Sequence, residues 1–138
     1  SLNVALFMGR AVIKFGGALI TEKKSRKVFR PDTILALAPI LSNIIDTGID
    51  LLIVHGAGSF GHIDAKSGDL SKGHIPGRED EQRRAREIVI ESMNELNKSI
   101  VSILEEQGIK CRCHPPREWA NGTGPEFEGD IGRFEEKG

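Results

Sequence analysis

The feature that most constrains the fold is an apolar strand that runs straight into a glycine loop, LLIVHGAGSFGH at residues 51–62. The run IDLLIVHG is apolar at nearly every position, a pattern typical of a parallel strand covered on both faces. Directly after it, Gly56, Gly58 and Gly61 stand in the spacing G-x-G-x-x-G. A strand-end loop of this kind predicts a nest of backbone amides that can hold an anion such as phosphate.

A second glycine turn closes an earlier strand. RAVIKFGG, residues 10–17, predicts a strand that stops at Gly16 and Gly17. Because the carboxyl ends of parallel strands share one edge of a sheet, we expect the two glycine turns to meet at the edge where such sheets bind ligands. Lys14 is the one charge in the apolar part of this strand. It is either an edge lysine with its ammonium in solvent or a cation placed between two phosphates.

Two helices are predicted by apolar residues at helical spacing. The first begins with Asp32 or Thr33 as its cap and ends at Gly48, with a kink or a late start at Pro39. The second runs from about Glu79 to Gln107 and ends at Gly108. Its apolar stripe contains Ala85, Ile88, Val89, Met93, Leu96, Ile100, Ile103 and Leu104.

The remaining segments carry weaker patterns. Residues 22–30 are polar and basic and predict a loop or hairpin, while IKCRCH at 109–114 alternates like a strand near a sheet edge. Residues 126–137 predict a weak helix with two glycines. Strands and helices therefore alternate, which indicates a single α/β domain over residues 1–138 with a mostly parallel sheet.

Composition excludes several functional classes. The net charge of −1 gives no global field for nucleic acid or anionic membrane, and aromatic residues, at 5%, offer no stacking platform for RNA. No apolar run approaches the roughly 20 residues that span a bilayer. Cys111 and Cys113 are too close for a useful disulfide, so we expect a reducing, cytoplasmic location. With His114 they offer three ligands but no fourth, and no metal site is predicted.

The glycine spacing also occurs in dinucleotide-binding turns. Those need a helix directly behind the loop, a further strand within about 30 residues and an acidic residue about 20 residues on. Here polar, glycine-bearing sequence follows the loop, and Asp80 is better explained as a cap at a helix start. The alternatives that remain are an anion cradle and a tight turn that needs glycine only for its backbone angles.

The two strand–turn motifs, IKFGGALIT and LLIVHGAGSFGH, together resemble the isopentenyl phosphate kinases, a branch of the amino-acid kinase superfamily. That branch has a K-x-G-G-S-x-I-T turn and an H-G-[AG]-G-[SA]-F-G-H loop, and its final histidine corresponds to His62. The resemblance extends from Val12 to Gly138 and weakens after Gly108. It implies a three-layer αβα sandwich, ATP and Mg²⁺ as cofactors, and a homodimer that phosphorylates isopentenyl phosphate to the diphosphate.

The resemblance also implies roles for individual residues. Lys14 would contact the transferring phosphoryl group, and His62 would hydrogen-bond the acceptor phosphate. ATP phosphates would be approached by Gly16, Gly17 and Lys23. The acceptor monophosphate would be held by the amides of Gly56, Ala57 and Gly58, while the size of the prenyl pocket would depend on Val89, Met93 and Leu96.

Two departures from the family pattern limit these roles. Ala18 replaces a serine that could serve as a phosphate ligand, and the chain stops where the family continues into an ATP-binding half. We therefore expect an acceptor-binding half without a complete nucleotide site. A kinase for another small phosphate or phosphonate, of the fosfomycin type, and a phosphate-binding, dimerising chain without turnover remain as alternatives.

Overall fold

A computed structural model of the chain describes residues 2–7, 9–122 and 124–135. Its main sheet has three strands in the order β1-β2-β3, formed by Leu2–Phe7, Arg10–Phe15 and Asp50–His55. β1 and β2 are antiparallel, whereas β2 and β3 are parallel. The α/β class is therefore confirmed, but the sheet in the described residues is mixed rather than mostly parallel.

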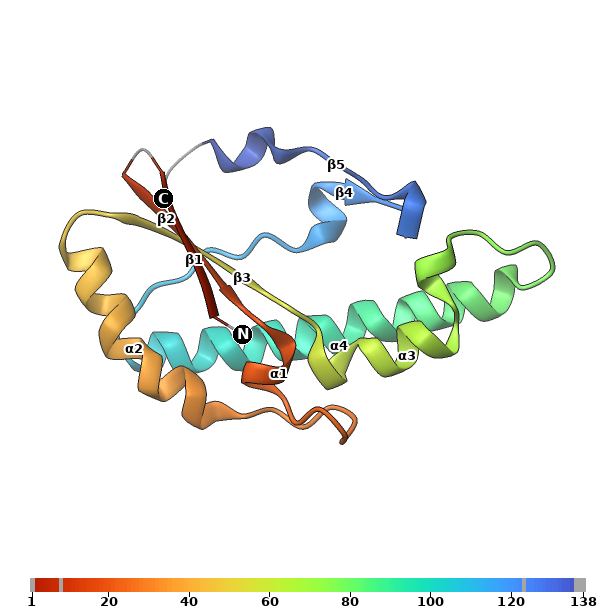
Figure 1. The fold of residues 1–138 in the computed structure, drawn as a ribbon, viewed down its shortest axis with the longest axis horizontal. Helices are drawn as coiled ribbons and strands as arrows, with labels where there is room; N and C mark the ends of the chain where they lie inside the picture. The colour runs from red at the N-terminus through yellow and green to blue at the C-terminus, as the bar shows by residue number, and fades with distance from the viewer. Residues whose placement is uncertain (1, 8, 123, 136–138) are drawn as a thin grey trace.

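Two helices form the layer on one side of this sheet (Figure 1). They are α2 at Pro31–Asp46 and α4 at Glu79–Glu106. α2 begins with Pro31 in its first turn and continues through Pro39 without the late start expected there. α4 carries acidic side chains in its first turn, where their negative charge interacts favourably with the helix dipole. The helix is followed by Gly108, whose φ of +85° suits a residue just after a helix end.

The hydrophobic core lies between this helical layer and the sheet. On β2 the buried side chains of Ala11, Ile13 and Phe15 alternate with an exposed Lys14, as the period of a strand requires. The core cluster itself consists of Ile13, Phe15, Ile20, Ile34, Ala38, Leu41, Phe60, Leu96, Ile100, Leu104 and Ile109. The predicted stripe on α4 is therefore the face that packs.

Short elements complete the chain. After β2 comes α1 at Gly17–Ile20, and after β3 come η1 at Gly58–Phe60, α3 at His62–Ser67 and η2 at Leu70–Lys72. The C-terminal part has a two-stranded sheet and three 3-10 turns, and Figure 1 shows it on the side of the sheet away from α2 and α4. Its elements are η3 at Pro116–Glu118, β4 at Ala120–Asn121, η4 at Gly124–Glu126, β5 at Glu128–Gly129 and η5 at Ile131–Phe134.

Three further sequence expectations differ from the structure, and one strand lies where none was expected. The opening LNVALF, assigned no element, is the edge strand β1, whereas 109–114 is not a strand because no neighbouring strand bonds to it within the described residues. The weak helix expected at 126–137 is not formed: its described part contains the end of η4, the strand β5 and the turn η5, and residues 136 and 137 lie outside the described ranges. β3 is only half-buried, with Val54 44% exposed, because the helical layer covers one face of the strand.

Candidate functional site

The two glycine turns meet at one edge of the sheet, as the sequence predicts. β2 and β3 are parallel and in register to their last residues, Phe15 and His55. The Gly56 amide then donates to the Phe15 carbonyl at 2.9 Å, which joins the start of one turn to the end of the other strand. The edge is therefore built from main chain that two separate segments contribute.

The turns approach so closely that no side chain fits between them. A Cβ placed on Gly17 would lie 2.3 Å from the Gly58 nitrogen. A Cβ on Gly58 would lie 2.0 Å from the Thr21 Oγ1 and 2.7 Å from the Gly17 oxygen, and Gly58 also has φ at +50°. Glycine is thus needed here for the contact as well as for the backbone angle.

Two buried hydroxyl groups, which sequence reasoning missed, hold the turns together. Thr21 is fully buried, donates from Oγ1 to the Gly17 carbonyl at 2.7 Å, and accepts from the Ser59 amide at 3.1 Å. The Ser59 Oγ, in turn, accepts from the Val28 amide at 3.3 Å. The sequence feature that could have indicated them is a hydroxyl residue close to each glycine turn, Thr21 in GGALIT and Ser59 in GAGS.

The loop amides differ in what they can offer an anion. The Gly56 amide is engaged with Phe15, so Gly56 contributes close packing instead, and a Cβ placed on it would lie only 2.9 Å from the Gly17 nitrogen. In the part of the chain that the structure describes, the amides of Ala57 and Gly58 have no hydrogen-bond partner. Adjacent unpaired amides in a glycine turn are the donor set that phosphate oxygens require.

Three basic side chains assigned to the site by resemblance are exposed. Lys14 lies on β2 opposite the core face, Lys23 lies between α1 and α2, and His62 is the first residue of α3, directly behind the glycine loop. Neither lysine forms an ion pair with the residues described here. Both ammonium groups are thus free to meet a phosphate, although their predicted roles stay predictions.

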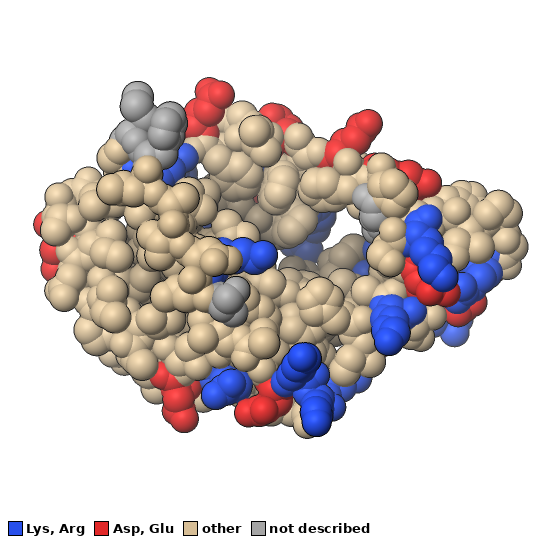
Figure 2. All heavy atoms as spheres, viewed as in Figure 1, with Lys and Arg blue, Asp and Glu red and all other residues tan. Residues whose placement is uncertain are grey.

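The basic run between α1 and α2 divides into paired and unpaired members. Figure 2 shows blue and red side chains interspersed on the lower edge, where this segment lies. Arg26 pairs with Asp64 at 3.2 Å and Lys27 pairs with Glu95 at 2.8 Å, so these two cations fasten the segment to α3 and α4. The Lys27 amide also donates to the Ser59 carbonyl at 3.0 Å. The run is therefore partly a structural clamp over the glycine loop.

Helix α4 forms the wall behind the loop. A Cβ on Gly61 would lie 3.6 Å from both the Met93 Sδ and the Val89 Cγ1. These two half-buried apolar side chains therefore stand next to the glycine loop. Leu96, by contrast, is fully buried in the core cluster, which also contains Phe60 of the loop.

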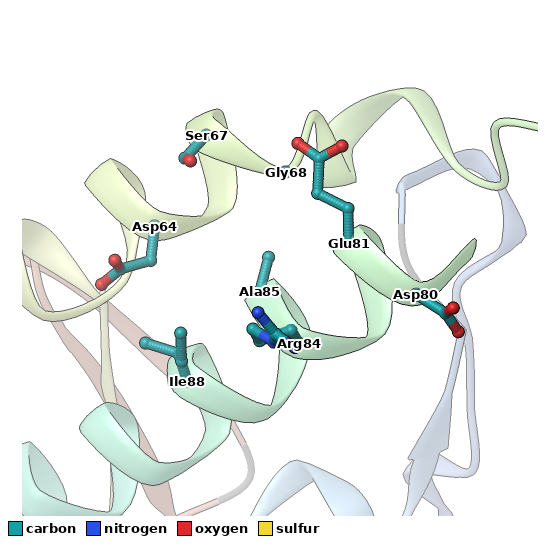
Figure 3. A pocket seen from close by; sticks show the side chains of 8 residues that line it. All are labelled: Asp64, Ser67, Gly68, Asp80, Glu81, Arg84, Ala85 and Ile88. Atoms are coloured by element: carbon teal, nitrogen blue, oxygen red, sulfur yellow. The ribbon is translucent and has the colours of Figure 1, made fainter. Parts of the chain in front are cut away.

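A cavity of about 330 Å³ lies between α3 and the start of α4 (Figure 3). Figure 3 shows Glu81 reaching toward Gly68, and Arg78 holds the pKa of the Glu81 carboxyl below its usual value through a side-chain hydrogen bond. Carboxylates outnumber cations on its walls, which suits neither a phosphate nor a prenyl chain. Its lining residues are Asp64, Ser67, Gly68, Asp80, Glu81, Arg84, Ala85 and Ile88.

The residues weighed for metal binding lie in different surroundings. Cys111 packs against the core, where desolvation raises the pKa of its thiol, whereas Cys113 is exposed. The His114 ring stacks edge-on against Phe134 at 5.1 Å. Among the described residues no three His, Cys, Asp or Glu side chains form a metal-binding group, and no described helix is long and apolar enough to cross a membrane.

Solved structures of other proteins share this fold. A solved structure titled "X-ray structures of isopentenyl phosphate kinase" shares the fold, with a TM-score of 0.75 and 24% identity over 90% of this chain and 51% of that one. The product complex of Thermoplasma acidophilum isopentenyl phosphate kinase has a TM-score of 0.58 and 31% identity, and matches 70% of this chain and 38% of that one.

The sequence comparisons lead to the same group. The curated Thermoplasma acidophilum isopentenyl phosphate kinase is 31% identical over 100 residues, which are 72% of this chain. This chain spans 38% of the length of that relative. Residues 9–129 match the Amino acid kinase family. The chain therefore belongs to the amino acid kinase family.

Proposed function

We propose that this chain carries the acceptor-phosphate site of an ATP-dependent kinase that converts isopentenyl phosphate to isopentenyl diphosphate. The observation that carries the proposal is the pair of interlocked glycine turns, which present the unpaired amides of Ala57 and Gly58 at the end of the sheet. The similarity to isopentenyl phosphate kinases supports the choice of acceptor.

The chemistry asked of these residues is positioning and charge neutralisation. Phosphoryl transfer needs little covalent participation from the protein, because most of the acceleration comes from alignment and from charge stabilisation. In the proposal the Ala57 and Gly58 amides hold the acceptor phosphate, and His62 donates a further hydrogen bond to it. Lys14 neutralises the phosphoryl group during transfer, and the open turn at Gly16 and Gly17 with Lys23 approaches the ATP phosphates.

In this proposal Mg²⁺ would enter with the ATP phosphates. Among the described residues, no group of three His, Cys, Asp or Glu side chains could hold the ion. Since the chain spans 38% of its curated relative, we further propose that these 138 residues bind the acceptor phosphate without turning it over by themselves.

The acceptor's tail is proposed to lie against α4. Val89 and Met93 border the loop at Gly61 and present apolar, adaptable surface to a short hydrocarbon chain. A small polar acceptor of the fosfomycin type would gain nothing from these two side chains.

We also propose that the protein forms a homodimer, which analytical ultracentrifugation would measure.

The test is a radiolabel assay with ATP labelled on its γ-phosphate, run on a full-length protein that contains this chain. We expect transfer to isopentenyl phosphate and much weaker transfer to methyl phosphate or to a small phosphonate. Equal transfer to all three acceptors would contradict the prenyl assignment, and transfer to none would contradict the kinase assignment.

A pair of variants on α4 tests the place of the tail in the same assay. Met93→Ser removes apolar contact beside the loop, so it should reduce transfer to isopentenyl phosphate more than transfer to methyl phosphate. The matched control is Ile90→Ser, because Ile90 is an apolar side chain of the same helix that is 42% exposed. A Met93 variant that behaved like the Ile90 variant would place the tail elsewhere.

A further inference from the structure

A chain of polar contacts connects the glycine loop with α4 and the segment that follows it. His55 is the last residue of β3 and is half-buried. Its Nδ1 lies 3.1 Å from the Gly56 carbonyl oxygen, and its Nε2 lies 3.3 Å from the Asn97 Oδ1 on α4. The Asn97 Nδ2 lies 3.4 Å from the Cys113 Sγ. The proposed phosphate contacts use none of these side chains.

The protons in this chain of contacts can be assigned by counting donors. Both nitrogens of the His55 ring face oxygen atoms, but a neutral imidazole has only one N–H. A half-turn of the Asn97 amide exchanges its oxygen and nitrogen. The Cys113 thiol can then donate to Asn97 Oδ1, Asn97 Nδ2 to His55 Nε2, and His55 Nδ1 to the Gly56 carbonyl. Every group is satisfied with a neutral ring.

The last bond in this series acts on the site because of peptide geometry. The Gly56 carbonyl and the Ala57 amide belong to one peptide group, which is planar and trans, so the C=O and the N–H point in opposite directions. Holding the carbonyl against the His55 ring therefore fixes the direction of the Ala57 N–H. That N–H has no partner among the described residues.

We propose that His55 and Asn97 are positioning residues that aim the Ala57 amide at the acceptor phosphate. The inference rests on the proposed function, because it requires an anion on that amide. Asn97 acts by holding His55 in the tautomer that carries its proton on Nδ1. His55 acts by fixing the Gly56–Ala57 peptide, and neither side chain touches the reacting atoms.

The first test is a titration of the ¹⁵N-labelled chain with inorganic phosphate, followed through the amide signals of Ala57 and Gly58. Asn97→Leu removes both polar contacts at similar volume, and the loss of one orienting hydrogen bond should weaken phosphate binding by about 2- to 10-fold. The matched control is Asn94→Leu, since Asn94 lies on the same helix and is also half-buried. We expect no change in phosphate affinity for the control.

The second test reads the ring directly. Long-range ¹H–¹⁵N correlation distinguishes a protonated from a bare ring nitrogen, and His55→Phe identifies the signals of His55 among the 4 histidines. We expect the proton on Nδ1 in the unmodified chain and a mixture of tautomers in Asn97→Leu. A proton held on Nε2, or equal phosphate affinity in the Asn97 and Asn94 variants, would overturn the inference while leaving phosphate binding intact. Failure of the unmodified chain to bind phosphate would instead overturn the proposed function.

Discussion

Thr21→Val tests how far one buried hydroxyl stabilises the junction of the two glycine turns. Valine has nearly the shape of threonine, so the substitution removes hydrogen bonds without opening a cavity. Thr21 is fully buried, and its Oγ1 is the acceptor for the Ser59 amide and the donor to the Gly17 carbonyl. Ser59 is also buried, so water cannot replace the lost partner.

The expected loss of stability follows from these contacts. Leaving a buried polar group without its partner costs about 1–3 kcal/mol. Only the Ser59 amide loses its partner, because the Gly17 carbonyl still accepts from the Thr21 amide at 2.9 Å, so we expect a loss of about 1–3 kcal/mol in the free energy of unfolding. This is a large share of the roughly 5–15 kcal/mol that stabilises a typical domain.

Urea denaturation followed by far-UV circular dichroism measures the effect, since α4 supplies a strong helical signal. The matched control is Thr47→Val, because Thr47 also donates from its hydroxyl to a backbone carbonyl, at 2.6 Å, but at an exposed helix end. We expect the control to stay within about 0.5 kcal/mol of the unmodified chain. A Thr21 variant as stable as the Thr47 variant would refute the account of the junction.

Other substitutions separate the parts of the site. Gly58→Ala should weaken phosphate binding in a titration and destabilise the chain, since its Cβ would lie 2.0 Å from the Thr21 hydroxyl and the residue has a φ of +50°. A Gly58→Ala variant with unchanged stability and phosphate affinity would contradict the close contact of the two turns. In full-length protein, Lys14→Ala should lower kcat about 10²–10³-fold. His62→Ala should raise KM for the acceptor and leave KM for ATP unchanged. If it raised KM for ATP instead, the loop before His62 would be the ATP site, and the roles of the two turns would be exchanged. Desolvation, with Arg133 and Arg112 nearby, lowers the pKa of His114 below 6.5, so the unfolded chain binds more protons. Stability should fall as pH drops below about 6.5, as read by the fluorescence of Trp119, and His114→Phe should abolish the change.

The parts of the molecule that sequence predicts best are those with strong local signals. The span of α4 is correct to within one residue at its C-terminus, because its apolar spacing, acidic first turn and terminal glycine agree. The meeting of the two glycine turns is also predicted, since parallel strands that end in glycines leave few other arrangements. Val89 and Met93 lie next to the loop for the same reason, because they belong to the packed stripe.

Features that depend on a partner distant in sequence are not predictable in this way. Segment 109–114 alternates like a strand, but alternation cannot supply the neighbour that a strand must bond. The availability of the Gly56 amide depends on where the Phe15 carbonyl lies, which no local pattern encodes. The contact of Asn97 with His55 likewise joins residues 42 positions apart.

The glycine junction also affects how this protein can change over evolution. In the proposed function the acceptor phosphate lies on main-chain amides, and the contact of Gly17 with Gly58 leaves no room for a side chain between the two turns. Substitutions at Gly17 and Gly58 are therefore closed to this lineage, and recognition of the phosphate could change only through residues around the two turns. A descendant with a different acceptor would keep the phosphate and vary the bordering side chains, such as Val89 and Met93, so new specificity would arise as changes of tail within one class of phosphorylated compounds.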